Sequence, residues 1–148
     1  MSGSLADRQA ALVATLVAGA PLPPGFDDRL VGVARSALLR KRAREVARHW
    51  PLLAAGLGDR WLSVFAGWAA ARPTRGALRD GWDLARQLAA EGDLPAPAAE
   101  ELAAREAGWR YDGTTAPRRR RLPAVRRAGG SWVFQVAGRI WTLPPHRR

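Results

Sequence analysis

Apolar residues recur at helical spacing over most of the chain, and the longest such stretch runs from Arg29 to Trp50. It contains no proline, and Pro51 closes it. Residues at i, i+4, i+7 and i+11 share one helix face, and this stripe comprises Leu39, Ala43, Val46 and Trp50. An earlier stripe points to nearly the opposite side and comprises Leu30, Ala34, Ala37 and Leu38. No proline or Gly-Ser pair marks the crossover, so we predict an unkinked central helix packed on both sides.

A shorter helix is predicted before this stretch. Ser4 and Asp7 have the spacing of a capping box, and Gly19 with Pro21 stops the helical pattern. The proline-rich segment Pro21–Phe26 cannot be helical and is expected to be an extended connector. An aspartate then caps the central helix, because a carboxylate suits its positive N-terminal end. The candidates for this cap are Asp27 and Asp28.

Three or four more helices are predicted after the central one. Pro51 begins a short helix that ends near Gly58. Asp59 is expected to cap the next helix, whose aromatic stripe is typical of a core and comprises Trp61, Val64, Phe65 and Trp68. Thr74 is expected to cap another helix, which Gly92 stops. A last helix follows the two prolines Pro95 and Pro97 and ends around Tyr111–Gly113.

Short β patterns follow the helices. The segments Leu122–Val125, Trp132–Val136 and Ile140–Leu143 resemble strands, and glycine-containing turns lie between them. We therefore predict a mainly α fold: a bundle of five to six helices with a small C-terminal antiparallel β-hairpin or three-stranded piece. The expected organisation is a helical domain over residues 1–113, a basic linker over 114–121 and a β appendage over 122–148.

Charge is distributed unevenly. The chain carries a net charge of +11, yet residues 114–148 contain nine arginines and no acid. The other 113 residues hold fifteen basic and thirteen acidic residues, which leaves +2. Two basic surfaces follow as candidates. A partner-binding surface on the central helix comprises Arg35, Arg42, Arg44, Arg48 and Trp50. A nucleic-acid contact in the tail comprises Arg118, Arg119, Arg120, Arg121, Arg126 and Arg127.

Catalytic patterns are not found. The chain has no cysteine, which excludes disulfides, thiolate nucleophiles and zinc–thiolate sites. Its two histidines, His49 and His146, have no partner at metal-ligand spacing. No nucleophilic side chain is paired with a recognisable general base. We therefore expect no catalytic, cofactor-binding or metal-binding residue and no enzyme activity. The N-terminus lacks a signal-peptide pattern and no run has membrane-spanning length, which favours a cytoplasmic protein without a membrane partner.

The order of the helical motifs resembles a known bacterial family over roughly Leu5 to Tyr111. The resemblance rests on Leu5 and Gln9, on Arg29-Leu30 with Val33-Ala34-Arg35, on Trp50-Pro51 and Leu57-Gly58, on Trp61 and Phe65, and on Pro73, Gly81 and Trp109. These residues resemble the N-terminal domain of HvfC-type companion proteins, a family labelled DNA-binding. The alanine- and arginine-rich composition makes this an actinobacterial-looking member. Ala34 departs from the family, which usually has tyrosine there, and the short basic β segment does not match the usual second domain.

This resemblance implies a non-catalytic adaptor. Companion proteins of that family pair with multinuclear-iron enzymes that oxidise cysteines in ribosomally made precursor peptides. The expected partner is therefore such an enzyme, its peptide, or both. The alternative is a nucleic-acid-binding protein that uses the basic central helix and the arginine-rich tail. In that reading Trp132, Phe134 and Trp141 could stack on single-stranded bases, although the core of a hairpin is the expectation we favour for them.

Overall fold

The computed structural model describes residues 4–120, 123–128, 131–136 and 139–143. In these residues the chain forms six α-helices, one 3-10 turn and five short strands. The helices are α1 (Leu5–Ala18), α2 (Asp28–His49), α3 (Pro51–Leu57), α4 (Trp61–Ala69), α5 (Ala77–Glu91) and α6 (Ala96–Gly108), with the 3-10 turn η1 (Gly58–Arg60) before α4. The predicted mainly α fold with a C-terminal antiparallel piece is confirmed. None of the helices in these residues has the length and apolar character needed to cross a bilayer.

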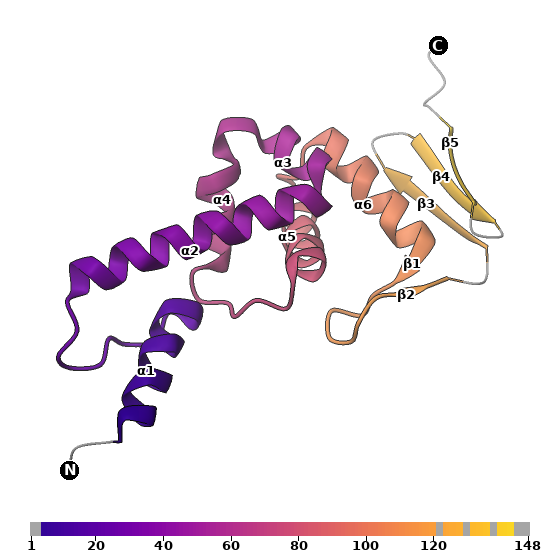
Figure 1. The fold of residues 1–148 in the computed structure, drawn as a ribbon. Coiled ribbons are helices and arrows are strands. Elements are labelled where there is room, and N and C mark those ends of the chain that lie inside the picture. Colours follow the sequence, from indigo (N-terminus) through magenta and orange to yellow (C-terminus); the bar gives the residue numbers. More distant parts are fainter. Residues whose placement is uncertain (1–3, 121–122, 129–130, 137–138, 144–148) are drawn as a thin grey trace.

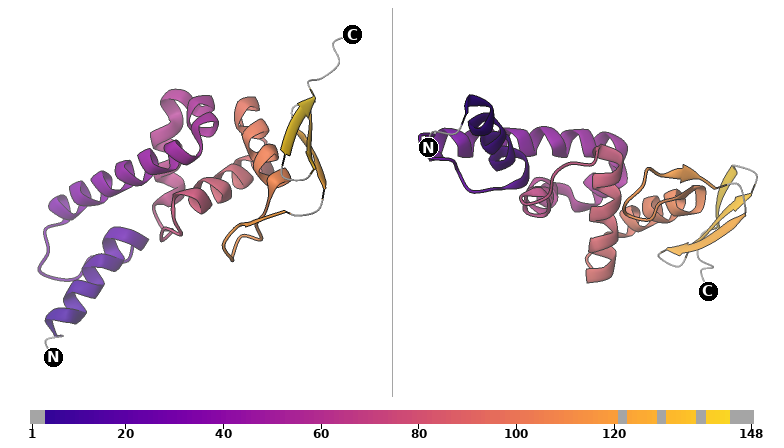
Figure 2. Two further views of the ribbon diagram at one scale, coloured as in Figure 1. Left: turned by 45° about the vertical axis from the view of Figure 1, so that its right-hand side comes forward. Right: turned by 90° about the horizontal axis from the view of Figure 1, so that it is seen from below.

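The molecule is elongated, with its N-terminal helices and its larger sheet at opposite ends (Figures 1 and 2). Helix α1 lies beside the first half of α2, and helices α3, α4 and α5 pack around the second half. Helix α6 lies between this bundle and the larger sheet. It contacts α3 and α5 of the bundle, and β3 and β4 of the sheet. The C-terminal strands are therefore attached to the bundle through α6.

Two antiparallel sheets form after α6. The smaller one pairs β1 (Trp109–Arg110) with β2 (Arg118–Arg119), so two residues of the predicted linker form a strand. The larger one has the order β3-β4-β5 and consists of β3 (Ala124–Ala128), β4 (Ser131–Val136) and β5 (Arg139–Leu143). The register places Phe134 opposite both Val125 and Trp141. Leu122 and the expected turn residues 129–130 and 137–138 lie outside the described residues.

The main core is built from tryptophans and small residues. Trp50 and Trp82 pack edge to face with ring centroids 5.8 Å apart, and both are almost fully buried. The predicted aromatic stripe on α4 is confirmed as core, because Phe65 is fully buried between the rings of Trp61 and Trp68. A second, smaller apolar cluster joins α6 to β4 through Ala103, Ala107 and Val133.

Helix termini agree with the sequence in part. The capping box of Ser4 and Asp7 is present, and Asp27 caps α2 by accepting the N–H groups of Arg29 and Leu30. Asp59 caps no helix, because it lies inside the 3-10 turn that leads into α4. The prediction for Thr74 is also wrong: α5 begins two residues later than a Thr74 cap requires, with Gly76 as the residue before it.

The predicted change of buried face along α2 is wrong. Leu30, Ala34 and Ala37 are exposed, and Leu30 keeps 67% of its surface accessible. The second stripe behaves as predicted, since Ala43, Val46 and Trp50 are buried. Only one side of the first half of α2 is covered, because α1 packs there while α4 and α5 contact the helix further along.

Candidate functional site

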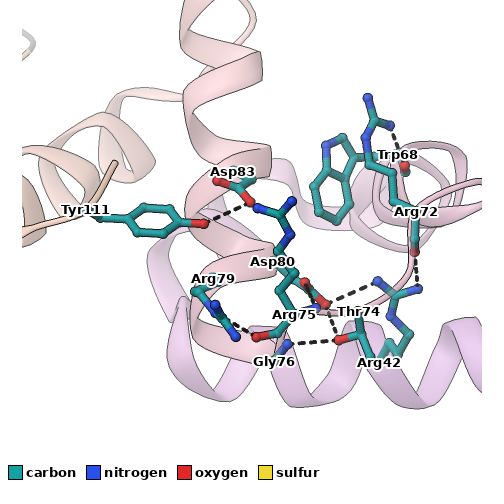
Figure 3. Close-up of polar contacts among 10 residues, drawn as sticks. All are labelled: Arg42, Trp68, Arg72, Thr74, Arg75, Gly76, Arg79, Asp80, Asp83 and Tyr111. Carbon is teal, nitrogen blue, oxygen red and sulfur yellow. Dashed lines mark hydrogen bonds and ion pairs between the residues drawn. The ribbon is translucent and has the colours of Figure 1, made fainter. Parts of the chain in front are cut away.

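Three of the five residues predicted to bind a partner hold the bundle together instead. The Arg42 side chain is buried, forms an ion pair of 3.1 Å with Asp80 and donates to the Arg72 carbonyl at 3.0 Å (Figure 3). Asp80 also accepts from the Thr74 hydroxyl at 2.6 Å and from the Arg75 N–H at 2.9 Å. This network closes the loop between α4 and α5 onto α2. Arg42 is therefore corrected from a surface residue to a structural one.

Trp50 and Arg35 are likewise engaged within the bundle. The Trp50 indole is fully buried and donates from Nε1 to the Leu78 carbonyl at 2.9 Å. Arg35 donates from Nη2 to the Ala70 carbonyl at 2.5 Å. Of the five residues predicted for this surface, the structure therefore leaves Arg44 and Arg48 exposed on α2, one helical turn apart.

A polar pocket of about 350 Å³ lies beside this network, between the α4–α5 loop and α5. Its lining includes the ring of Trp68, the Arg72 side chain that stacks on that ring at 5.2 Å, and the carboxyl of Asp83. Burial raises the pKa of Asp83, and the Tyr111 hydroxyl donates to Asp83 at 3.1 Å. Burial, followed by the contact with Asp83, raises the pKa of Tyr111. The contact between Tyr111 and Asp83 links α5 to the segment after α6. The residues around this pocket therefore have a structural role.

The described arginines of the tail divide into partly buried members that donate to backbone carbonyls and exposed members. Arg120 donates from Nε to the carbonyls of Glu106 and Trp109, at 3.0 and 3.1 Å. Arg126 is half-buried and donates to the carbonyl of Val125. The exposed members are Arg118, Arg119 and Arg127. Arg121 lies outside the described residues. Of the five predicted contact residues that the structure describes, three are exposed and two are held by backbone carbonyls.

The larger sheet is covered by α6 on one face only, as far as the described residues extend. We call the opposite side the outer face; its residues are Val125, Arg127, Trp132, Phe134, Val136, Arg139, Trp141 and Leu143. Trp132 and Trp141 are 45% and 50% exposed, so the favoured expectation that these rings form a hairpin core is wrong. Val133 turns inward instead, because α6 presents alanines at the contact.

A groove of about 410 Å³ lies between α3, α6 and β5, which is an edge strand of the larger sheet in the described residues. Leu52 of α3, Trp109 and Ile140 supply apolar surface, and Glu100 supplies an exposed charge. Its remaining lining residues are Glu101, Ala104, Arg105 and Thr142. Sequence reasoning missed this groove, because its residues come from α3, α6, β1 and β5 and share no local pattern. Within the described part of the chain, no group of three or more His, Asp or Glu side chains could hold a metal ion.

Comparison with known proteins places the helical part in a family. Residues 6–90 match the family described as SCO6045-like, C-terminal domain. A UPF0276 protein of Streptomyces avermitilis is 39% identical over 125 residues, which is 84% of this chain and 25% of that protein. The chain thus spans about a quarter of the length of this curated relative. No solved structure matches the chain. Because the matched segment covers more than half of its residues, the chain belongs to the SCO6045-like C-terminal domain family.

Proposed function

We propose that this domain is an adaptor that carries no reaction of its own and holds a polypeptide partner, either an enzyme or that enzyme's peptide substrate. The observation that carries this proposal is the apolar groove beside the edge strand β5. All five residues of β5 are exposed, and among the described strands only β4 pairs with it, along one of its edges. A partner segment that adds to the other edge gains main-chain hydrogen bonds from the strand and side-chain contacts from the groove.

The geometry at β5 suits an extended peptide. Side chains of a strand alternate between the two faces, so an added strand sends every second side chain toward the groove. The groove offers Leu52, which is 43% exposed, and Ile140, which is 45% exposed, as apolar contacts. The intervening side chains of the peptide reach the outer face beside Arg139 and Trp141. Alternate side chains of one bound segment would therefore contact the groove and the outer face.

The matches to known proteins support a domain that acts together with another polypeptide segment. The family is described as a C-terminal domain, and three quarters of the UPF0276 relative lies outside the matched region. The resemblance to HvfC-type companion proteins supplies the identity of the partner in this proposal: a multinuclear-iron oxidase acting on a precursor peptide. A cytoplasmic location for the complex belongs to the same proposal.

The proposal is tested by affinity capture with the tagged 148-residue protein from cells that produce it. Leu52→Glu places a charge in the groove at an exposed position, so it should leave the fold intact. Leu62→Glu is the matched control, because Leu62 is 47% exposed on α4 and lies outside the groove. We expect the wild type and Leu62→Glu to retain one stoichiometric polypeptide. Leu52→Glu should retain about one tenth of that amount, because binding would bury an unpaired charge.

Equal retention by both variants would contradict the assignment of the groove. Iron in the captured polypeptide, measured by elemental analysis, would support the enzyme named by the resemblance. A captured polypeptide without iron would point to the peptide instead.

Nucleic-acid binding is the second candidate, favoured by the exposed Arg118, Arg119 and Arg127 in a segment without acids. If about six arginines met the phosphates of a single strand, the logarithm of the binding constant would fall with the logarithm of salt concentration with a slope of about −4. A titration of a single-stranded oligonucleotide at several salt concentrations measures this slope. A slope near zero, or no binding at low salt, would rule this candidate out.

A further inference from the structure

The larger sheet has apolar residues on both faces, but only one face is covered in the described structure. Strand β4 reads Ser-Trp-Val-Phe-Gln-Val, with Val133 fully buried against α6 and its neighbour Trp132 45% exposed on the other side. Apolar residues on both faces of a strand, here Trp132 and Phe134 on one side and Val133 on the other, are typical of sheets that are covered on both faces. The outer face therefore has the composition of a surface that another element covers.

The residue types on the outer face are those of a protein interface. Six of its eight residues are aromatic or aliphatic, the other two are arginines, and none is Lys, Asp or Glu. Tryptophan and arginine dominate the energetics of protein interfaces, whereas Lys, Asp and Glu are depleted there. The rings of Trp132 and Phe134, both on the central strand, stack with their centroids 6.4 Å apart.

The two arginines occupy opposite corners of this face. Arg127 pairs with Trp132 at one end of β4, and Arg139 pairs with Val136 at the other end. The two arginines lie on different edge strands, β3 and β5. Strand geometry places their Cα atoms about 16 Å apart, since they are separated by two strand spacings and four residue steps. The apolar residue Phe134, in the middle of β4, lies between these corners.

We propose that the outer face binds an amphipathic helix of a protein partner, with an apolar stripe flanked on both sides by acidic residues. An α-helix with its side chains is about 10–12 Å wide, so it fits between the two arginine corners. Its apolar stripe covers Trp132, Phe134 and Trp141, while its acidic flanks meet Arg127 on one side and Arg139 on the other. Segment 114–148 carries nine arginines without an acid, so its field attracts the same partner.

Other occupants fit less well. Two copies of this face would bring the same positive charges together. A nucleic acid needs many phosphate contacts, whereas this face offers two cations and three aliphatic side chains, Val125, Val136 and Leu143. One ring face at the centre is also partly occupied, since the Arg127 guanidinium lies 5.5 Å from the Trp132 ring centroid. The site goes beyond the groove at β5 and shares with that proposal only the positions of Arg139 and Trp141 on β5.

The test uses synthetic helical peptides of about 18 residues, titrated against the full chain by calorimetry at about 0.1 M salt. One peptide has a leucine stripe with glutamate flanks, a second has the same stripe with lysine flanks, and a third has glutamate flanks with serine in place of leucine. We expect the first peptide to bind at least about tenfold more tightly than the other two. The double variant Arg127→Glu/Arg139→Glu should reverse the preference between glutamate and lysine flanks. A structural role of these arginines would not reverse it.

The double variant Arg29→Glu/Arg60→Glu makes the same change in net charge at exposed positions away from the sheet and should leave the preference unchanged. Equal binding of the glutamate and lysine peptides, or of the leucine and serine peptides, would overturn the proposal. So would tighter binding of a thymidine oligonucleotide or of phosphatidylcholine–phosphatidylglycerol vesicles, which would assign the face to nucleic acid or to a membrane. Leu52→Glu should leave peptide binding on the outer face intact, so failure of this proposal and failure of the groove proposal are distinguishable.

Discussion

Trp50 shows how one buried ring constrains its neighbours. A Cβ atom added at Gly81 of α5 would lie 2.2 Å from Trp50 Cδ1, and the indole is fully buried with its N–H bonded to Leu78. Gly81→Ala should therefore destabilise the fold by about 2 kcal/mol or more, although alanine is the better helix former. Gly67→Ala on α4 is the matched control: its Cβ meets nothing within 4 Å, so it should stabilise by about 0.5–1 kcal/mol. Urea unfolding measures both, and equal effects would contradict the packing described.

Arg42 makes a second prediction at this scale. Arg42→Met leaves Asp80 buried without its cation, which should cost about 3 kcal/mol of the free energy of unfolding. Arg44→Met removes a charge of the same type two residues away at an exposed position, and its effect should stay within about 0.5 kcal/mol. Thermal unfolding followed by circular dichroism compares the two. If both variants unfold at the wild-type temperature, the network around Asp80 contributes little.

The pair of Asp83 and Tyr111 predicts how stability depends on pH. Burial raises the pKa of Asp83 above its ordinary 3.8, so the folded state holds this proton more tightly than the unfolded state. Its contribution to stability is then present at acid pH and is lost as the pH rises through the folded pKa. The difference in stability between wild type and Asp83→Asn should therefore shift against the wild type as the pH is raised from about 4. An opposite shift, measured by urea unfolding across that range, would contradict the burial of this carboxyl.

The Tyr111 hydroxyl should also make stability fall with rising pH, in the alkaline range. Burial, helped by the hydrogen bond to Asp83, raises the pKa of Tyr111 above 10.0. The unfolded state loses the proton first, so stability should fall as the pH rises above about 10. Tyr111→Phe removes this dependence, and a spectrophotometric titration of the single tyrosine measures the raised pKa directly.

At the scale of elements, the N-cap of α2 is a clear test. The sequence left Asp27 and Asp28 open as caps, because adjacent aspartates satisfy the same pattern. The structure selects Asp27, whose carboxylate accepts two backbone N–H groups. Asp27→Ala should cost about 1 kcal/mol, and Asp28→Ala only a few tenths. Equal losses in urea unfolding would contradict this assignment.

The elements also show what sequence periodicity can and cannot predict. Helix bodies and the alternation of β4 were predictable, since both depend on local spacing of apolar residues. Which side of β4 faces inward was not, because the answer depends on the alanines that α6 presents to it. The caps at Asp59 and Thr74 failed for a similar reason. Thr74 and Arg75 meet the distant network of Arg42 and Asp80, which a local pattern does not reveal.

The candidate sites were less predictable than the fold. Basic residues on α2 looked alike in sequence, yet Arg42 is buried and Arg44 is exposed, because only the former faces α5. The groove at β5 joins Leu52 to Ile140, which lie 88 positions apart in the sequence. Such a site appears only once α3, α6 and the sheet are assembled.

At the scale of the whole molecule, the proposed binding surfaces gather at one end. The outer face belongs to the larger sheet and the groove borders its strand β5, while α1 and the first half of α2 lie at the other end (Figure 1). The bundle between them positions α6, and α6 supports the sheet. This arrangement suits an adaptor that presents its sheet to a partner.

Hydrogen exchange of the 148-residue protein, alone and with its captured polypeptide partner, tests this account most directly. We predict slower exchange of backbone amides in β5, Arg139–Leu143, together with protection around Leu52 of α3, and no change in the first half of α2. Protection confined to α1 and α2, or exchange in β5 that the partner leaves unchanged, would contradict the assignment of the sheet as the docking surface.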